Sequence, residues 1–100
     1  MLKVLLICSM GASTSVLCEK IKDEAQKEGV DLDIWATALS MSGDEIGKAD
    51  IILLGPQIRY MKSKVTKDAE GKPVEAIDMQ TYGKLDGKKV FEIIKEMRDK

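Results

Sequence analysis

The chain has 100 residues, of which 44% are hydrophobic, and its 16 basic residues are balanced by 17 acidic ones, so we expect one domain over residues 1–100 and no nucleic-acid partner. The sequence contains no histidine and only two cysteines, without metal-ligand spacing, and we therefore expect no metal site, no cofactor and no catalytic imidazole. Its apolar runs are too short for a signal peptide or a membrane span, which predicts a cytoplasmic protein.

The N-terminal part of the chain predicts a buried strand followed by a helix. Leu2 to Ile7 is an almost unbroken apolar run, typical of a parallel strand that is buried on both faces. From about Ser13 to Glu28 apolar residues recur at helical spacing, and Gly29 stands where the C-terminus of a helix favours glycine. Cys18 shares the apolar face of this helix, so we expect it to pack in the core.

The middle of the chain predicts two strands around a short helix. Leu32 to Ala38 alternates between apolar and polar or bulky residues, as expected of a strand at a sheet edge. A short helix is expected from Ser42 to Lys48, begun by Ser42 or Asp44 as its N-cap. Asp50 to Leu54 then predicts a second buried strand.

The rest of the chain predicts a helix, a strand and a final helix. Gly55-Pro56 ends the preceding strand, and the proline suits the first turn of a helix that continues through Val65. Val74 to Asp78 predicts a fourth strand, and the apolar stripe from Val90 to Met97 a helix that reaches the C-terminus. The expected element order is βαβαβαβα.

This alternation predicts an α/β fold with a doubly wound parallel sheet and helices on both faces. The two long apolar strands must be central, which gives the flavodoxin-like order 2-1-3-4. Ligands in such sheets bind at the carboxyl ends of the strands where the strand order reverses, here between strands one and three. The stretches Cys8 to Ser15 and Gly55 to Tyr60 should therefore lie together.

The stretch between the first strand and the first helix has the composition of an anion-binding loop. Amide N–H groups at the start of a helix are unpaired and carry partial positive charge, and Gly11 and Ala12 let a ligand approach the backbone closely. The same features stabilise a negative sulfur, so we expect Cys8 to be a thiolate near neutral pH and a nucleophile for a phosphoryl group. The predicted phosphate-binding loop comprises Ser9, Met10, Gly11, Ala12, Ser13, Thr14 and Ser15.

The predicted phosphate loop with its cysteine also resembles the active-site motif of the low-molecular-weight tyrosine phosphatases. That motif is a cysteine, five residues and an arginine. In this chain the position of that arginine is occupied by Thr14. Without the guanidinium, attack by water should be slow, which favours a phosphoryl carrier over a hydrolase. A cysteine-dependent phosphatase and a non-catalytic phosphate- or flavin-binding module stay open as alternatives.

Three stretches resemble the lactose/cellobiose (chitobiose) family of enzyme IIB components of the bacterial sugar phosphotransferase system. They are CSMGASTS at Cys8 to Ser15, ADIILLGPQIRYM at Ala49 to Met61 and IDMQTYGKLDGKKV at Ile77 to Val90. The resemblance implies that Cys8 accepts a phosphoryl group from a phosphohistidine of enzyme IIA. It also implies that the group then passes to a β-disaccharide of the cellobiose, lactose or chitobiose class, bound by the membrane permease enzyme IIC, with which the protein associates transiently.

Residues outside the loop contribute three further expectations. Tyr82 could reach the phosphoryl oxygens with its hydroxyl, or it could pack onto the core. Asp78 could act as an acid, although a phosphohistidine donor hardly needs one. We expect Met10, Ala12 and residues Pro56 to Tyr60 to form part of the face that docks the two partners.

Overall fold

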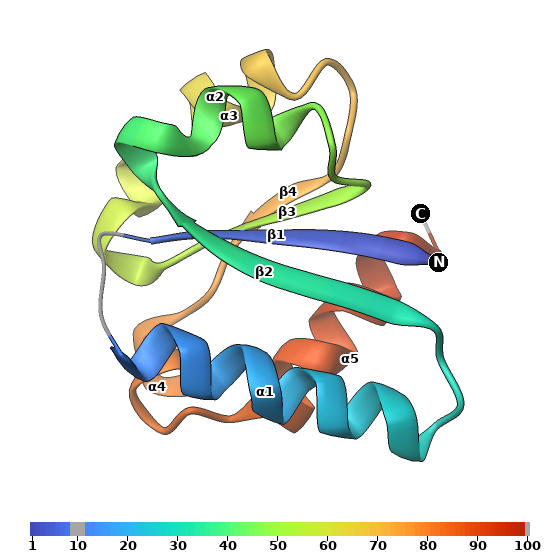
Figure 1. Ribbon diagram of the computed structural model, residues 1–100. Coiled ribbons are helices and arrows are strands. Elements are labelled where there is room, and N and C mark those ends of the chain that lie inside the picture. The colour runs from blue at the N-terminus through green and yellow to red at the C-terminus, as the bar shows by residue number, and fades with distance from the viewer. Residues whose placement is uncertain (9–11, 100) are drawn as a thin grey trace.

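The computed structural model describes residues 1–8 and 12–99, and the side chains of Ala12 and Ser13 are not among the parts described. Within these described residues there are four strands, each followed by at least one of five α-helices, and two 3₁₀ helices, η1 and η2 (Figure 1). In order they are β1 (Leu2–Cys8), α1 (Ala12–Lys27), β2 (Leu32–Ala38), η1 (Leu39–Met41), α2 (Ser42–Ile46), β3 (Ile51–Leu54), η2 (Pro56–Met61), α3 (Lys62–Asp68), β4 (Val74–Ala76), α4 (Met79–Gly83) and α5 (Gly87–Arg98).

The strands form one parallel sheet in the order β2-β1-β3-β4, which confirms the predicted doubly wound topology. Helices α1, α4 and α5 cover one face of this sheet, and α2 and α3 cover the other (Figure 1). The two central strands, β1 and β3, are buried from Val4 to Cys8 and from Ile51 to Leu54. Their apolar side chains supply both cores, as the near-continuous hydrophobic runs predict.

Alternation along β1 decides which core each of its side chains joins. Val4 and Leu6 belong to the cluster that contains residues of α1, α4 and α5, whereas Leu5 and Ile7 belong to the cluster under α2 and α3. Because successive side chains of a strand point to opposite faces, Cys8 lies on the same side as Val4 and Leu6. The sulfur is therefore directed toward α1 and α4.

The predicted helix after the first strand is confirmed, with its end shifted by one residue. α1 ends at Lys27, and Gly29 takes the left-handed conformation with φ of 70°. The amide of Val30 donates to the carbonyl oxygen of Ala25 at 2.8 Å, which closes the helix end.

Predictions for three connecting segments were wrong in detail. The short helix is α2, which follows η1 and ends at Ile46. Its N-cap position is Met41, so neither Ser42 nor Asp44 is the N-cap. The Ser42 hydroxyl instead donates to the carbonyl oxygen of Leu39. Pro56 does begin a helix, but its first six residues are 3₁₀. The fourth strand stops at Ala76.

Helix α4 was absent from the predicted elements because it has only five residues, too few for an apolar stripe to repeat. Its one local signal is Asp78, which is the N-cap: the carboxylate accepts from the amide of Thr81 at 3.0 Å and from its hydroxyl at 2.6 Å. Asp78 is thus a structural cap of an exposed turn, which accounts for this residue without the acid role considered above.

Replacing Asp78 by alanine should lower the melting temperature at neutral pH by a few degrees, because the amide of Thr81 loses its acceptor. The hydrogen bonds from Thr81 hold the pKa of the Asp78 carboxyl below its ordinary value of 3.8. A depressed pKa in the folded state means that the stabilisation is present above pH 3.8 and is lost as the pH falls through the folded-state value. Thermal melts of both proteins from pH 7 to pH 2.5 should show the difference shrinking in acid; a difference that grows in acid would contradict this assignment.

Candidate functional site

Cys8 is the last residue of β1 and lies at the predicted switch point of the sheet. The amide of Gly55, just after β3, donates to the carbonyl oxygen of Ile7 at 2.8 Å. A Cβ atom added to Gly55 would lie 3.2 Å from the Cβ of Cys8 and 2.9 Å from Oε1 of Gln57. The ends of the two central strands therefore meet as predicted, and the glycine permits their close approach.

Three of the seven residues of the predicted phosphate loop are outside the described residues. This holds for Ser9, Met10 and Gly11, while Ala12 and Ser13 are the first two residues of α1. A helix does therefore begin four positions after Cys8, and its partial positive charge is at the end that follows the cysteine. The anion-binding geometry of the loop and the ionised state of Cys8 stay predictions.

Three side chains, those of Cys8, Thr14 and Tyr82, form a hydrogen-bond chain that begins at the sulfur. Sγ of Cys8 lies 3.2 Å from Oγ1 of Thr14, and this oxygen lies 2.7 Å from the hydroxyl oxygen of Tyr82. All three residues are almost inaccessible, with 3%, 2% and 8% of their surface exposed. Thr14 comes from the first turn of α1 and Tyr82 from α4, so these hydrogen bonds link β1 to two separate helices.

Tyr82 packs onto the core, which is one of the two placements expected for it. Its ring is buried among apolar side chains of the core, and its hydroxyl has a hydrogen-bond partner in Thr14. Direct contact with phosphoryl oxygens stays a prediction. Sequence reasoning did not predict the pairing with Thr14, because the two residues are 68 positions apart and the helix that carries Tyr82 was not predicted.

A cavity of about 370 Å³ opens beside Cys8 on the side of β2. Ala38 is the register partner of Cys8 in the sheet, and the small side chains at this end of β2 leave space in front of the sulfur. Ser15, the only described side chain of the predicted loop besides Thr14, also borders this space. The described lining residues are Cys8, Thr14, Ser15, Ala36, Thr37, Ala38 and Met41.

The second cysteine has a different environment. Cys18 is buried in the core cluster under α1, as predicted, and burial raises the pKa of its thiol to about 11, against a smaller opposing effect of Lys22. A thiol with this pKa is almost entirely protonated at neutral pH and is a poor nucleophile.

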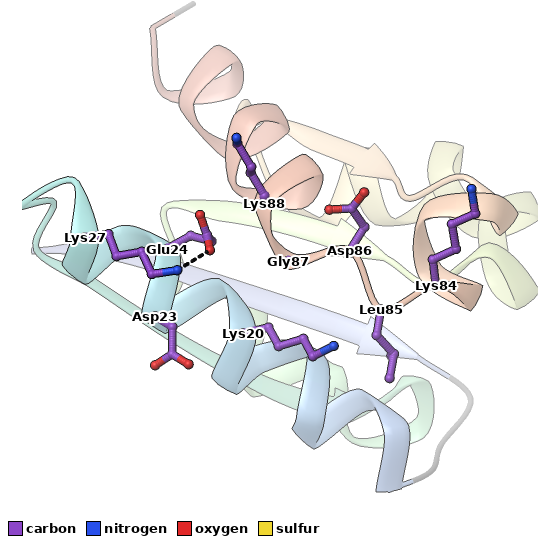
Figure 2. A pocket seen from close by; sticks show the side chains of 9 residues that line it. All are labelled: Lys20, Asp23, Glu24, Lys27, Lys84, Leu85, Asp86, Gly87 and Lys88. Atoms are coloured by element: carbon purple, nitrogen blue, oxygen red, sulfur yellow. Dashed lines mark hydrogen bonds and ion pairs between the residues drawn. The ribbon is translucent and has the colours of Figure 1, made fainter.

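A wider groove of about 460 Å³ lies between α1 and the turn from α4 to α5 (Figure 2). Charged side chains of both signs border it, and one pair, Lys27 and Glu24, forms an ion pair of 3.2 Å. The lining contains no cysteine and no hydroxyl-bearing side chain, and it shares no residue with the cavity at Cys8. We therefore place the candidate site at Cys8.

Residues 1–8 and 12–99 contain neither a cluster of metal-ligating side chains nor a membrane-spanning helix. No group of three or more cysteine, aspartate or glutamate side chains lies close enough to hold a metal ion in this part of the chain. None of the helices described for it has the length and apolar character needed to cross a membrane.

Comparison with known proteins gave consistent matches along most of the chain. The family described as "PTS system, Lactose/Cellobiose specific IIB subunit" matches residues 3–93. The oligo-beta-mannoside-specific EIIB component of Bacillus subtilis is 45% identical over 94 residues, covering 92% of this chain and 91% of that protein. The galactose-specific EIIB component of Lactococcus lactis subsp. cremoris is 39% identical over 95 residues, covering 88% of each chain.

Solved structures agree with these matches. The lactose-specific IIB component domain from Streptococcus pneumoniae superposes with a TM-score of 0.85 at 27% identity and covers 96% of both chains. The cellobiose-specific IIB component from Borrelia burgdorferi gives a TM-score of 0.78 at 30% identity, with 96% of this chain and 90% of that chain covered.

Proposed function

Because this chain belongs to the lactose/cellobiose-specific IIB subunits of the phosphotransferase system, it is a sugar phosphotransferase component, and we propose that Cys8 is the residue that carries its phosphoryl group. The observation that supports Cys8 most is its position: it ends a central strand at the switch point and is followed by a helix N-terminus. The other thiol, Cys18, lies within α1 and not before its N-terminus, and burial raises the pKa of this thiol to about 11.

Two transfers describe the proposed cycle. In the first, the Cys8 thiolate attacks the phosphorus of a phosphohistidine, an S–P bond forms, and the N–P bond breaks with its electron pair remaining on the ring nitrogen. When the other ring nitrogen is protonated, the leaving group is neutral imidazole, so this chain needs no general acid. In the second, a sugar hydroxyl attacks phosphorus, the S–P bond breaks and returns its electron pair to sulfur, and the hydroxyl proton passes to a base outside this chain.

The partners follow from this cycle. We propose enzyme IIA as the phosphohistidine donor and the membrane permease enzyme IIC as the protein that presents the sugar. The relatives are named for oligo-β-mannoside, galactose and cellobiose, which supports a β-linked disaccharide or a related sugar as the acceptor. The protein then acts beside the membrane, at the cytoplasmic side of the permease.

Exposed apolar side chains at the carboxyl end of the sheet support a docking face on the side of the molecule that holds Cys8. Of the five large apolar side chains that are exposed in the described chain, four come from segments that follow the carboxyl ends of the strands, at the left in Figure 1. They are Val16 in α1, Met41 in η1, Tyr60 in η2 and Met79 in α4, with 45% to 74% of their surface exposed. Exposed apolar groups on segments at the same end of the sheet favour contact with another protein. Tyr60 belongs to the expected docking stretch Pro56–Tyr60, and Ala12 begins the same helix as Val16.

The double variant Met41→Ser, Met79→Ser should slow phosphoryl transfer from IIA about tenfold, because two apolar contacts of the encounter are lost. The melting temperature should stay near that of the parent protein, since both side chains are exposed. Gln26→Ser, an exposed change near the opposite end of α1, is the matched control. Equal transfer rates for the double variant and the control would remove these methionines from the docking face.

The test of the function itself is incubation with phosphorylated IIA proteins, followed by intact-mass analysis and peptide mapping. The proposal expects a gain of one phosphoryl mass on the Cys8 peptide, and release of that mass when IIC-containing membranes and the sugar are added. Turnover of an aryl phosphate by the isolated protein, without any such gain from IIA, would instead identify a phosphatase.

A further inference from the structure

The three-member chain of Cys8, Thr14 and Tyr82 has a direction once the sulfur is ionised. A thiolate only accepts hydrogen bonds, whereas threonine and tyrosine each have one hydroxyl proton. If the sulfur is negative, the proton of Thr14 must point at it, and the only way to keep the 2.7 Å contact is for Tyr82 to donate to Thr14. The neutral thiol permits either order.

We propose that Thr14 and Tyr82 are positioning residues that hold Cys8 as the attacking thiolate, with Tyr82 donating to Thr14 and Thr14 donating to the sulfur. This inference relies on the proposed function only in taking Cys8 as the nucleophile. A hydrogen bond to a charged acceptor is about twice as strong as a neutral one, so the chain favours the thiolate over the thiol. The hydrogen bond from Tyr82 polarises the one from Thr14, because a hydroxyl oxygen that accepts a hydrogen bond becomes a better donor.

The burial of Thr14 and Tyr82 strengthens these two hydrogen bonds. Thr14 and Tyr82 are shielded from water, so no solvent molecule competes strongly for their protons, and the local dielectric is low. The Tyr82 ring is fixed by the core cluster that also holds Leu6 and Leu17, which keeps its hydroxyl at one place. Thr14 is fixed by the first turn of α1. The thiolate thus meets a donor that needs no reorganisation before attack.

Thr14 also supplies a hydrogen-bond donor at the position where the loop lacks the arginine of the phosphatase motif. Thr14 occupies the position at which the phosphatase motif has arginine, and a neutral donor there can stabilise a thiolate without adding the charge that promotes attack by water on the phosphoryl group. A carrier has to keep its phosphoryl group until the acceptor arrives. A hydroxyl donor at this place fits that requirement better than a guanidinium.

The test is the rate of Cys8 alkylation by iodoacetamide as a function of pH, read by peptide mapping so that Cys18 is counted separately. Thr14→Val keeps the shape of the side chain and removes the donor, and it should move the midpoint of the pH profile upward by about one to two pH units. Tyr82→Phe removes only the second hydroxyl and should move it by about half a unit. Thr14→Ser, which restores a hydroxyl, should stay near the parent protein.

Thr66→Val, at an exposed position of α3, is the control for the loss of a threonine hydroxyl on a helix. A purely structural role would change the alkylation rate by the same factor at every pH, and a profile whose midpoint stays in place in folded Tyr82→Phe and Thr14→Val would overturn the proposal. If Thr14→Val does not fold, Tyr82→Phe and Thr14→Ser still decide the question. The assay needs no IIA, so a shifted midpoint together with no phosphoryl transfer would leave this inference standing and refute the proposed function instead.

Discussion

Cys8→Ser is expected to lower the rate of phosphoryl acceptance from IIA by a factor of about 1000 or more, because a serine hydroxyl keeps its proton at neutral pH and is a far weaker nucleophile. The substitution exchanges one sulfur for one oxygen with little change in the size of the side chain, so the fold should survive. Intact-mass analysis after incubation with phosphorylated IIA should show the parent protein gaining one phosphoryl mass and the variant none.

Cys18→Ala is the matched control, since it removes the other thiol of the chain. That thiol is buried in the core under α1 and protonated, so its loss should reduce stability slightly and leave phosphoryl acceptance near the parent level. Loss of acceptance in Cys18→Ala with acceptance retained in Cys8→Ser would reverse the assignment. Acceptance by both variants would place the phosphoryl group on a residue other than cysteine.

Gly87→Ala is expected to destabilise the protein by about 2–3 kcal/mol, which for a domain of this size corresponds to a melting temperature lower by about 10–20 °C. Gly87 is the first residue of α5 and faces α1 (Figure 2). A Cβ atom added there would lie 2.7 Å from the Cβ of Lys20, 2.8 Å from its carbonyl carbon and 3.0 Å from its carbonyl oxygen. The obstruction is helix backbone, so the two helices would have to separate.

Gly43→Ala is the control for the change of residue type. Gly43 lies inside α2, and an added Cβ there meets no atom within 4 Å. Alanine has the higher helix propensity, so this variant should be neutral or stabilised by about 0.5–1 kcal/mol. Thermal or urea unfolding of both variants measures the difference. Gly87→Ala as stable as Gly43→Ala would mean that α1 and α5 can separate at little cost.

The amino-acid sequence by itself determined the sheet and the position of Cys8 at its switch point. The apolar runs Val4–Ile7 and Ile51–Leu54 have no polar side chain on either face, which makes their strands central and puts the switch point after Cys8. The central strands can be predicted because each apolar run extends over several neighbouring residues. The alternation along β1 also decides that the sulfur faces the same side as Val4 and Leu6.

The tertiary structure alone decided what surrounds that sulfur. The hydrogen bond between Thr14 and Tyr82 joins residues 68 positions apart, and the helix that carries Tyr82 is too short to show a periodic pattern. Likewise, the contact of Gly87 with Lys20 and the cavity beside Ala38 arise only when helices and strands pack. Local patterns in a sequence report which face of an element is buried, whereas the identity of the neighbour on that face depends on how all the elements pack at once.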